Sequence, residues 1–240
     1  MTLAEQLDQA ERTRTAIPQV VSRSGADADA AYRIQEALVA RRVSRGERLV
    51  GLKLGLTSRA KMAQVGVDQV IWGRLTDAMR IDDGGTVDTG RYIHPRVEPE
   101  VAFRLDATGA ATAVAPALEV IDSRYADFKF TLPDVIADNT SAAGFVIGAW
   151  QPLPPGVDNL GVLLEVDGRV VQIGSTAAIL GDPRRAVTAA ATLAASAGVP
   201  VEDGWVLLAG AATAAVPLTP GAHVRAVVEG LGTAALRAAS

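Results

Sequence analysis

Two glutamates spaced two residues apart, Glu98 and Glu100, are the first residues whose arrangement suggests chemistry. On a strand, this spacing in R-V-E-P-E-V-A-F would place both carboxylates on one face, about 7 Å apart at roughly 3.3 Å per residue. Pro99 lies between them and cannot donate a backbone hydrogen bond, so we expect a sheet edge or an interrupted strand pairing there. Because two neighbouring like charges repel, a compensating cation is expected.

A third glutamate, Glu119, lies in the apolar stretch P-A-L-E-V-I-D. A carboxylate on a buried strand is costly unless it is paired or bound to a metal ion. Three carboxylates with no cysteine or histidine nearby are typical ligands of a hard cation, Mg²⁺ or Mn²⁺. The alternative is that Glu98 and Glu100 are solvated positions on an edge strand and that Glu119 pairs with Arg124.

Lys53 is a candidate catalytic residue because of its position in G-L-K-L-G-L-T. The aliphatic residues of this stretch alternate and fill one face of a strand, so Lys53 points to the other face. Gly51 and Gly55 flank it there and leave room for a ligand or for another backbone. The alternative is a lysine on the surface of the sheet. Asp77, in R-L-T-D-A-M, is either a second polar site residue or a turn or cap residue.

The composition excludes several classes of protein. The chain has 240 residues, a net charge of −4 and no cysteine, so it has no electrostatic basis for binding nucleic acid and no disulfide or cysteine-based zinc site. The N-terminus is polar, and no run of about 18 apolar residues is present. We therefore expect a globular protein of the cytoplasm that does not interact with a membrane.

The elements that must position these residues begin with helices. The pattern predicts a first helix from about Thr2 to Val21 and a second from Asp27 or Asp29 to Gly46. A strand over Leu49–Thr57 follows, and Ser58 can cap a short helix that ends at Gly66.

In most of the remaining chain, the residue pattern predicts strands and turns. Asp167-Gly168 between two alternating runs indicates a two-residue hairpin turn. One helix interrupts the strands, with Asp182 as N-cap and Gly198 as terminator. The fold class is therefore α+β, with a helical extension over residues 1–48 and a β-rich catalytic domain over residues 49–240 that together form one structural unit. The predicted strands are Arg96–Leu105, Ala117–Ser123, Phe145–Trp150, Val162–Val166, Arg169–Ile173, Trp205–Ala209 and His223–Val228.

Taken together, several stretches resemble the hydratase and decarboxylase branch of the fumarylacetoacetate hydrolase superfamily, which acts in aromatic meta-cleavage pathways. They occur in the order of the family between about Tyr32 and Gly232, and their joint match is far more specific than any single piece. The stretches are G-L-K-L-G-L-T-S-R-A-K-M-A-Q-V-G-V, W-G-R-L-T-D-A-M, I-H-P-R-V-E-P-E-V-A-F, A-L-E-V-I-D-S-R-Y-A-D-F-K-F, V-I-A-D-N-T-S and G-A-A-T-A-A-V.

The resemblance implies a site and a fold. Glu98, Glu100 and Glu119 fall on the metal ligands of the family, and Lys53 and Asp77 fall on polar positions of its active site. The implied fold is a mixed, strongly bent β-roll with N-terminal and peripheral helices, and its members are usually oligomeric. One departure is the short connection from Leu105 to Pro116, where relatives usually carry a helix-bearing segment. Because of this departure, the resemblance does not fix the position of Glu119 and does not imply a particular lid over the site.

The resemblance also implies a reaction on a small 2-oxo acid. S-R-A-K-M-A-Q, F-K-F and T-A-A-V are more similar to decarboxylases of 2-oxo-3-hexenedioate than to hydratases of 2-hydroxypenta-2,4-dienoate. We expect Mg²⁺ or Mn²⁺ as cofactor, with Arg124, Lys129 and Thr213 as substrate-binding residues. The hydratase is the first alternative, and a non-catalytic subunit of such an enzyme is the second. A homo-oligomer is expected, with a possible complex with the hydratase or decarboxylase of the same pathway.

Overall fold

Two capped helices open the chain in the computed structural model, which describes residues 1–58, 62 and 69–240. The first, α1 (Leu3–Thr13), begins with a capping box between Thr2 and Glu5. The second, α2 (Ala28–Ser44), is capped by the Asp27 side chain, which is one of the two predicted caps. The predicted end of the first helix is wrong, because Ile17 forms a β-bridge with Tyr125 and the following proline disfavours helical geometry at Ile17.

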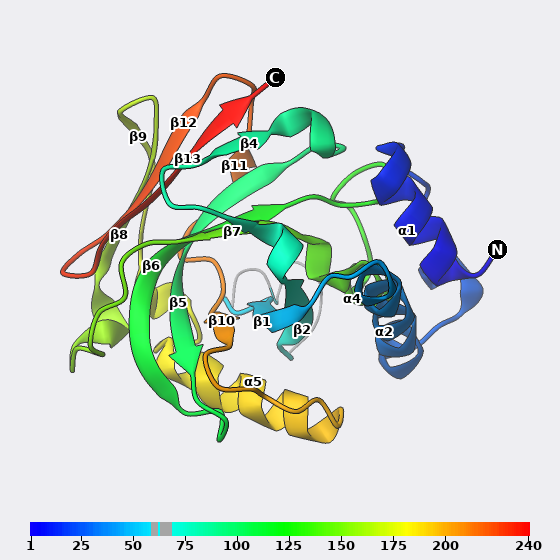
Figure 1. Cartoon of the computed structure of the whole chain (residues 1–240), viewed down its shortest axis with the longest axis horizontal. Coiled ribbons are helices and arrows are strands. Elements are labelled where there is room, and N and C mark those ends of the chain that lie inside the picture. Colours follow the sequence, from blue (N-terminus) through cyan, green and yellow to red (C-terminus); the bar gives the residue numbers. More distant parts are fainter. Residues whose placement is uncertain (59–61, 63–68) are drawn as a thin grey trace.

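An eight-stranded mixed sheet forms the centre of the molecule (Figure 1). Its strand order is β2-β1-β10-β5-β6-β7-β3, and the short β11 also pairs with β5. The longest members, β5 and β6, form an antiparallel hairpin whose connection is an Asx turn at Asp106. These strands are β1 (Leu49–Gly55), β2 (Ile71–Thr76), β3 (Arg80–Ile81), β5 (Arg96–Leu105), β6 (Ala111–Ile121), β7 (Ala142–Ile147), β10 (Val206–Leu208) and β11 (Val216–Pro217).

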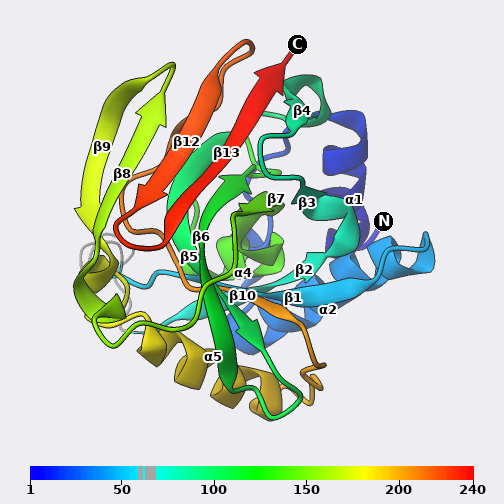
Figure 2. The ribbon, with the colours of Figure 1, turned by 60° about the vertical axis from the view of Figure 1, so that its left-hand side comes forward.

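A second, five-stranded sheet covers one part of the first (Figure 2). Its order is β4-β13-β12-β8-β9, so β9 is an edge strand. The turn between β8 and β9 is the predicted hairpin turn, and both of its residues have positive φ, 52° at Asp167 and 76° at Gly168. The strands are β4 (Thr86–Asp88), β8 (Gly161–Val166), β9 (Arg169–Ser175), β12 (His223–Val228) and β13 (Gly232–Ala239).

The hairpin of β5 and β6 connects two parts of the hydrophobic core. At one end, Val101 and Phe103 pack in the cluster that contains the alanines of α5 (Arg184–Ser196). At the other end, Val97 and Val120 pack in the cluster with β12 and β13. The opposite face of β5 is buried as well, so the glutamates on it lie inside the molecule.

The remaining helices lie around the sheet. α5 runs beneath it, and α4 (Leu132–Ala137), which the sequence did not predict, packs against α2 (Figure 1). Asp182 was predicted as the N-cap of α5, but the N-cap is the next residue, Pro183. The Asp182 carboxylate still accepts a hydrogen bond from the N–H of Arg184, the first residue of the helix. Single-turn 3-10 helices occur at Ser22–Ser24, Asp77–Met79, Thr89–Arg91, Asn139–Ser141, Val157–Asn159 and Thr176–Ala178.

The α+β fold class is confirmed, with helices first and a bent β body after them. The connection from Leu105 to Pro116 is largely strand, since β6 begins at Ala111. The helix predicted from Ser58 to Gly66 falls outside the described residues. The division at residue 48 stays a prediction. Within the part of the chain that the structure describes, no helix has both the length and the apolar character needed to cross a bilayer.

Candidate metal centre and active site

The three predicted carboxylates converge on one face of the β5–β6 hairpin. The register places Glu98 directly opposite Glu119, and Glu100 follows two residues along β5. One carboxylate oxygen from each residue lies within 4.8 Å of those of the other two. Glu100 and Glu119 are fully buried and Glu98 is 5% exposed, so the alternative of solvated edge positions is wrong.

The electrostatics of this cluster call for a cation. Burial, together with the charges of Glu119 and Glu98, raises the pKa of Glu100 well above its usual value. Burial raises the pKa of Glu119 to about 7, although Lys53 opposes this shift. The Oε1 atoms of Glu100 and Glu119 have no hydrogen-bond partner among the described residues. Buried carboxylate oxygens without donors suit a divalent ion with oxygen ligands, so these residues fit Mg²⁺ or Mn²⁺.

Lys53 lies beside the cluster on β1. Its Nζ is 2.9 Å from Oε2 of Glu119 and donates to the carbonyl oxygen of Thr140 at 3.0 Å. The predicted orientation is therefore confirmed, and Glu119 pairs with Lys53, not with Arg124. Close packing requires both flanking glycines, because a Cβ on Gly51 would lie 2.0 Å from the carbonyl oxygen of Val206 and a Cβ on Gly55 would lie 2.6 Å from the methyl group of Thr140.

The carbonyl that holds Lys53 belongs to an unusual turn. Asn139, Thr140 and Ser141 all have positive φ, at 50°, 54° and 58°. Non-glycine residues in this region are strained and persist only where other contacts fix them. Here the Asn139 amide bonds to both the N–H and the carbonyl oxygen of Arg74. The stretch D-N-T-S carried no assigned role at the sequence level, because a left-handed turn of three non-glycine residues has no spacing signal.

Pro99 lies where strand pairing on one side of β5 is interrupted, as predicted. β10 pairs with β5 only as far as Ala102, and β11 resumes the pairing at Val97. Between them, the segment 209–212 crosses the glutamates, and the N–H of Gly210 donates to Oε2 of Glu100 at 2.8 Å. A backbone N–H of this segment thus bonds to a carboxylate of the protein.

A pocket of about 180 Å³ opens beside the cluster. Lys53 and Glu98 line one side of it, and most of its other lining residues are apolar. No role in a pocket was predicted for these apolar residues, which come from the end of β1, from β2, β6 and α4, and from the loop before α4. They are Leu56, Ile71, Ile121, Phe128, Phe130 and Val135.

Two predicted site residues are engaged elsewhere. Asp77 follows the end of β2 and bonds to the Arg48 backbone and guanidinium, at 2.9 Å and 3.0 Å. Six residues of strand, about 20 Å, separate it from Ile71 at the pocket. Arg124 is 1% exposed and pairs with Glu11 of α1 and with Asp138, each at 3.4 Å. The structure does not bring either residue to the glutamates, and Arg124 instead ties α1 to the sheet.

Two further predicted residues lie at the margin of the site. Lys129 is exposed, and its ammonium makes no hydrogen bond or ion pair with any described residue, while its neighbours Phe128 and Phe130 line the pocket. The Thr213 hydroxyl donates to the Ala214 carbonyl oxygen, and its methyl group packs close to Gly174 of β9. Neither side chain contacts the carboxylates.

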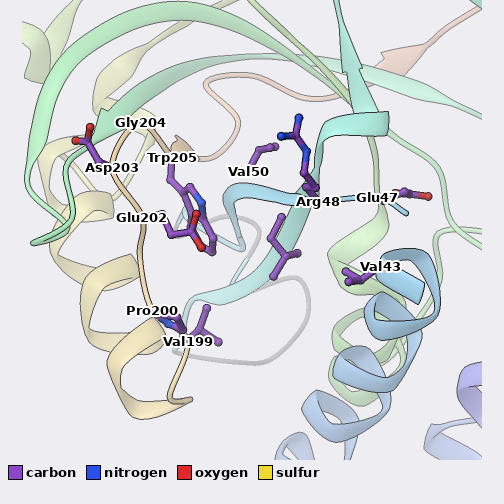
Figure 3. Close-up of a pocket in the computed structure, with 11 residues that line it drawn as sticks. Val43, Glu47, Arg48, Val50, Val199, Pro200, Glu202, Asp203, Gly204 and Trp205 are labelled. Atoms are coloured by element: carbon purple, nitrogen blue, oxygen red, sulfur yellow. The ribbon is translucent and has the colours of Figure 1, made fainter. Parts of the chain in front are cut away.

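A larger cavity, of about 580 Å³, lies at the opposite ends of β1 and β10 (Figure 3). Val43, Val199, Pro200 and Trp205 contribute apolar surface to it. Its charged lining residues are Glu47, Arg48, Glu202 and Asp203, and Glu47 is already bonded to Arg42 and Thr76. Among the described residues, the carboxylates that converge closely enough to hold a metal ion are Glu98, Glu100 and Glu119, so we place the chemistry in the smaller pocket.

Known proteins of similar sequence identify the family of this chain. No family model matches the chain. A 4-oxalocrotonate decarboxylase from a Pseudomonas species is 52% identical over 96% of this chain and 94% of its own length. The chain belongs to the hydratase and decarboxylase branch of the fumarylacetoacetate hydrolase superfamily.

Other members of this branch are also similar to the chain over nearly its whole length. A 2-hydroxyhexa-2,4-dienoate hydratase from Comamonas testosteroni is 32% identical over 98% of this chain and 96% of its own. A solved 4-oxalocrotonate decarboxylase from Pseudomonas putida G7, complexed with magnesium and adipate, has a TM-score of 0.93 and 38% identity over 98% of this chain and 95% of its own. The fold implied by the resemblance is therefore confirmed.

Proposed function

We propose that this chain decarboxylates 2-oxo-3-hexenedioate to 2-hydroxypenta-2,4-dienoate, with Mg²⁺ held by Glu98, Glu100 and Glu119. The observation that carries the proposal is the convergence of three buried carboxylates beside an ion-paired lysine and an apolar pocket. Two decarboxylases at 52% and 39% identity support it. One solved relative, determined with magnesium and adipate and also with calcium and acetate, supports it as well.

The reaction needs a place for negative charge that develops on the substrate. When bound, Mg²⁺ supplies Lewis-acid stabilisation for the charge on the keto oxygen of a 2-oxo acid. Lys53 has three N–H donors, of which two are directed at Glu119 and Thr140. The third donates to the developing oxyanion, and the left-handed turn at Thr140 keeps the ammonium fixed for this role.

The apolar wall suits loss of CO₂. The bond between C5 and C6 breaks, C6 leaves as CO₂, and its electron pair passes through the conjugated chain to the keto oxygen, which gives a dienolate. One proton then neutralises that oxygen and yields the 2-hydroxy-diene. No water takes part in bond cleavage, and Phe128, Phe130 and Val135 exclude it from the chain of the substrate.

The hydratase is the second candidate because relatives of that name reach 35% identity. Hydration needs polar groups that deliver water to the carbon chain. Apart from Lys53 and Glu98, the polar lining residues of the described pocket are Thr140 and Ser141. The complete set of carboxylates with its lysine also favours an active enzyme over a non-catalytic subunit.

We also propose that the chain forms a homo-oligomer in the cytoplasm and a complex with the hydratase of the same pathway. The outer face of the five-stranded sheet supports self-association. Register aligns Ile173, Leu163 and Val227 in one row across this face, and Ile173 is 76% exposed. Such a contiguous apolar row on a sheet is typical of an interface.

A paired assay tests the function. Protein with Mg²⁺ is given 2-oxo-3-hexenedioate or 2-hydroxypenta-2,4-dienoate, and CO₂ release and loss of the diene absorbance are followed. We expect CO₂ from the first substrate, little turnover of the second, and no turnover with excess chelator. Turnover of the diene without CO₂ release from the enedioate would assign the chain to the hydratases. Full activity with excess chelator would contradict the metal site.

A further inference from the structure

Arg96 begins β5 and lies on the same face as the glutamates. It precedes Glu98 by two residues, so its side chain leaves the strand on the side of Glu98 and Glu100. Across the hairpin it is paired with Ile121, which lines the pocket. The topology therefore places a cation beside a residue that lines the pocket, on the same face of the hairpin as the proposed metal ligands.

The Arg96 guanidinium is held by an aromatic ring and has free donors. Its central carbon lies 5.3 Å from the ring centroid of Phe128, which lines the pocket. It makes no hydrogen bond or ion pair with the residues that the structure describes, in contrast to the engaged guanidinium of Arg124. A guanidinium that is stacked on a ring and keeps its fork of donors free is arranged to bind a carboxylate.

A second polar group adjoins the same ring. The His94 ring centroid lies 5.2 Å from that of Phe128. Its Nε2 is buried and has no hydrogen-bond partner among the described residues. Buried polar atoms are rarely left unsatisfied, so this nitrogen indicates a missing polar partner beside the Phe128 ring, which Arg96 also contacts.

The spacing fits a six-carbon dicarboxylate. The Cα atoms of Arg96 and Glu98 are about 7 Å apart along the strand. Five C–C bonds of about 1.5 Å separate the two carboxylate carbons of such a chain, which spans about 6–7 Å when extended. We infer that Arg96 binds the distal carboxylate of the substrate while its 2-oxo acid end lies at Glu98, Glu100 and Glu119. The inference rests on the proposed function and names the residue that selects a dicarboxylate.

This role predicts different effects of Arg96 on KM and on kcat. A tight grip on the distal carboxylate stabilises the ground state and does not help that group to leave as CO₂. Arg96 should therefore lower KM without raising kcat. Arg96→Gln should raise KM for 2-oxo-3-hexenedioate by about 10-fold or more, as for the loss of a charge-assisted bond, and leave kcat unchanged or slightly higher.

The binding test uses two unreactive ligands that differ only at the distal end. 2-Oxoadipate and 2-oxohexanoate carry the same 2-oxo acid, and neither has the double bond needed for decarboxylation. Titration calorimetry of Mg²⁺-loaded protein should give at least about 10-fold tighter binding of 2-oxoadipate. Arg96→Gln should abolish this preference, Arg96→Lys should retain part of it, and Mg²⁺ affinity should not change.

Arg104 provides a matched control. It lies on the same face of β5 and is stacked on Trp150 at 4.6 Å, but beyond Glu100. Arg104→Gln should keep the preference for 2-oxoadipate. Equal weakening of both ligands in Arg96→Gln, or no preference in the unaltered protein, would overturn the inference. Loss of the preference in Arg96→Gln, with no CO₂ release by the unaltered protein, would instead reject only the proposed reaction.

Discussion

At the residue scale, Glu100 has opposite effects on the stability of the metal-free and of the metal-bound protein. Its pKa is raised in the fold by burial and by two neighbouring carboxylates. The ionised group therefore destabilises the fold increasingly as pH rises above the unfolded value of about 4.5. Bound Mg²⁺ removes this penalty, and stabilises the fold further by mass action.

We therefore expect Glu100→Gln to melt at a higher temperature than the unaltered protein in chelator at pH 8. The same variant should lose most of the stabilisation by Mg²⁺, because a ligand has been removed. Thermal unfolding with and without Mg²⁺ checks both effects. Glu202→Gln, at an exposed position, should change neither. A Glu100→Gln protein that Mg²⁺ stabilises as much as the unaltered one would exclude Glu100 as a ligand.

Lys53 should act on turnover. Lys53→Met removes the donor proposed for the oxyanion, so kcat should fall by about 10²-fold or more, as is typical for one such donor. Steady-state kinetics with 2-oxo-3-hexenedioate measure this effect, and circular dichroism checks that the fold is retained. Lys53→Arg, which keeps the charge, should retain more activity than Lys53→Met. An unchanged kcat in Lys53→Met would show that Lys53 has a structural role and does not stabilise the oxyanion.

Sequence reasoning succeeded where one strand spacing decides the geometry. Glu98, Glu100 and Lys53 could be placed on their faces because side chains alternate strictly along a strand. Arg124 and Asp77 could not be placed, because their ion pairs with Glu11 and Arg48 join elements far apart in sequence. The same alternation also places Arg96, two residues before Glu98, on the face of the glutamates.

At the element scale, the segment that crosses β5 depends on a glycine. Gly210 has a φ of 112°, and a Cβ on it would lie 2.1 Å from Oγ1 of Thr57. Gly210→Ala should therefore displace the N–H that donates to Glu100, weaken Mg²⁺ binding, and lower the free energy of unfolding by more than about 1–3 kcal/mol. Calorimetry and urea unfolding measure the two effects.

Gly204 serves as the control for this substitution. It also has positive φ, 82°, but a Cβ there would meet nothing within 4 Å. Gly204→Ala should cost only the backbone strain, about 1 kcal/mol, and leave Mg²⁺ affinity intact. Equal loss of affinity in both variants would show that the close approach to Thr57 is not what matters.

The attachment of α1 should weaken in acid. Burial alone would raise the pKa of Glu11, but the charges of Arg124 and Arg42 outweigh it and lower that pKa. This stabilisation is therefore present above the unfolded value of about 4.5 and is lost as pH falls below it. Urea unfolding from pH 7 to pH 3.5 should show a steeper loss for the unaltered protein than for Glu11→Gln. Parallel curves would contradict the role of this carboxylate.

Element boundaries were predictable where caps and turns are local. Asp27 and the Asp167-Gly168 turn were identified correctly because each acts within three residues. α4 and the strands β2, β3, β4, β11 and β13 were not predicted, and α4 and the short β3 and β11 are held by neighbours that are distant in sequence. The early end of α1 was missed for the same reason, because Ile17 pairs with Tyr125.

At the scale of the whole molecule, the exposed row on the five-stranded sheet predicts association. Ile173→Asp places a charge in this row and should lower the molar mass measured by light scattering after size-exclusion chromatography. Val43→Asp, at a position that is also partly exposed but lies on α2, should not. A mass equal to that of one chain for the unaltered protein would reject the oligomer, and an unchanged larger mass for Ile173→Asp would reject this face.

The short turn at Asp106 also limits how the gene can change in length. Glu98 and Glu119 face each other only because the hairpin keeps one register. If an inserted or deleted residue shifted the pairing by one, Glu119 would turn to the face of Val120 and enter an apolar cluster. Insertions at this turn can therefore persist in descendants only if they bulge outward and leave the pairing of the two strands unaltered.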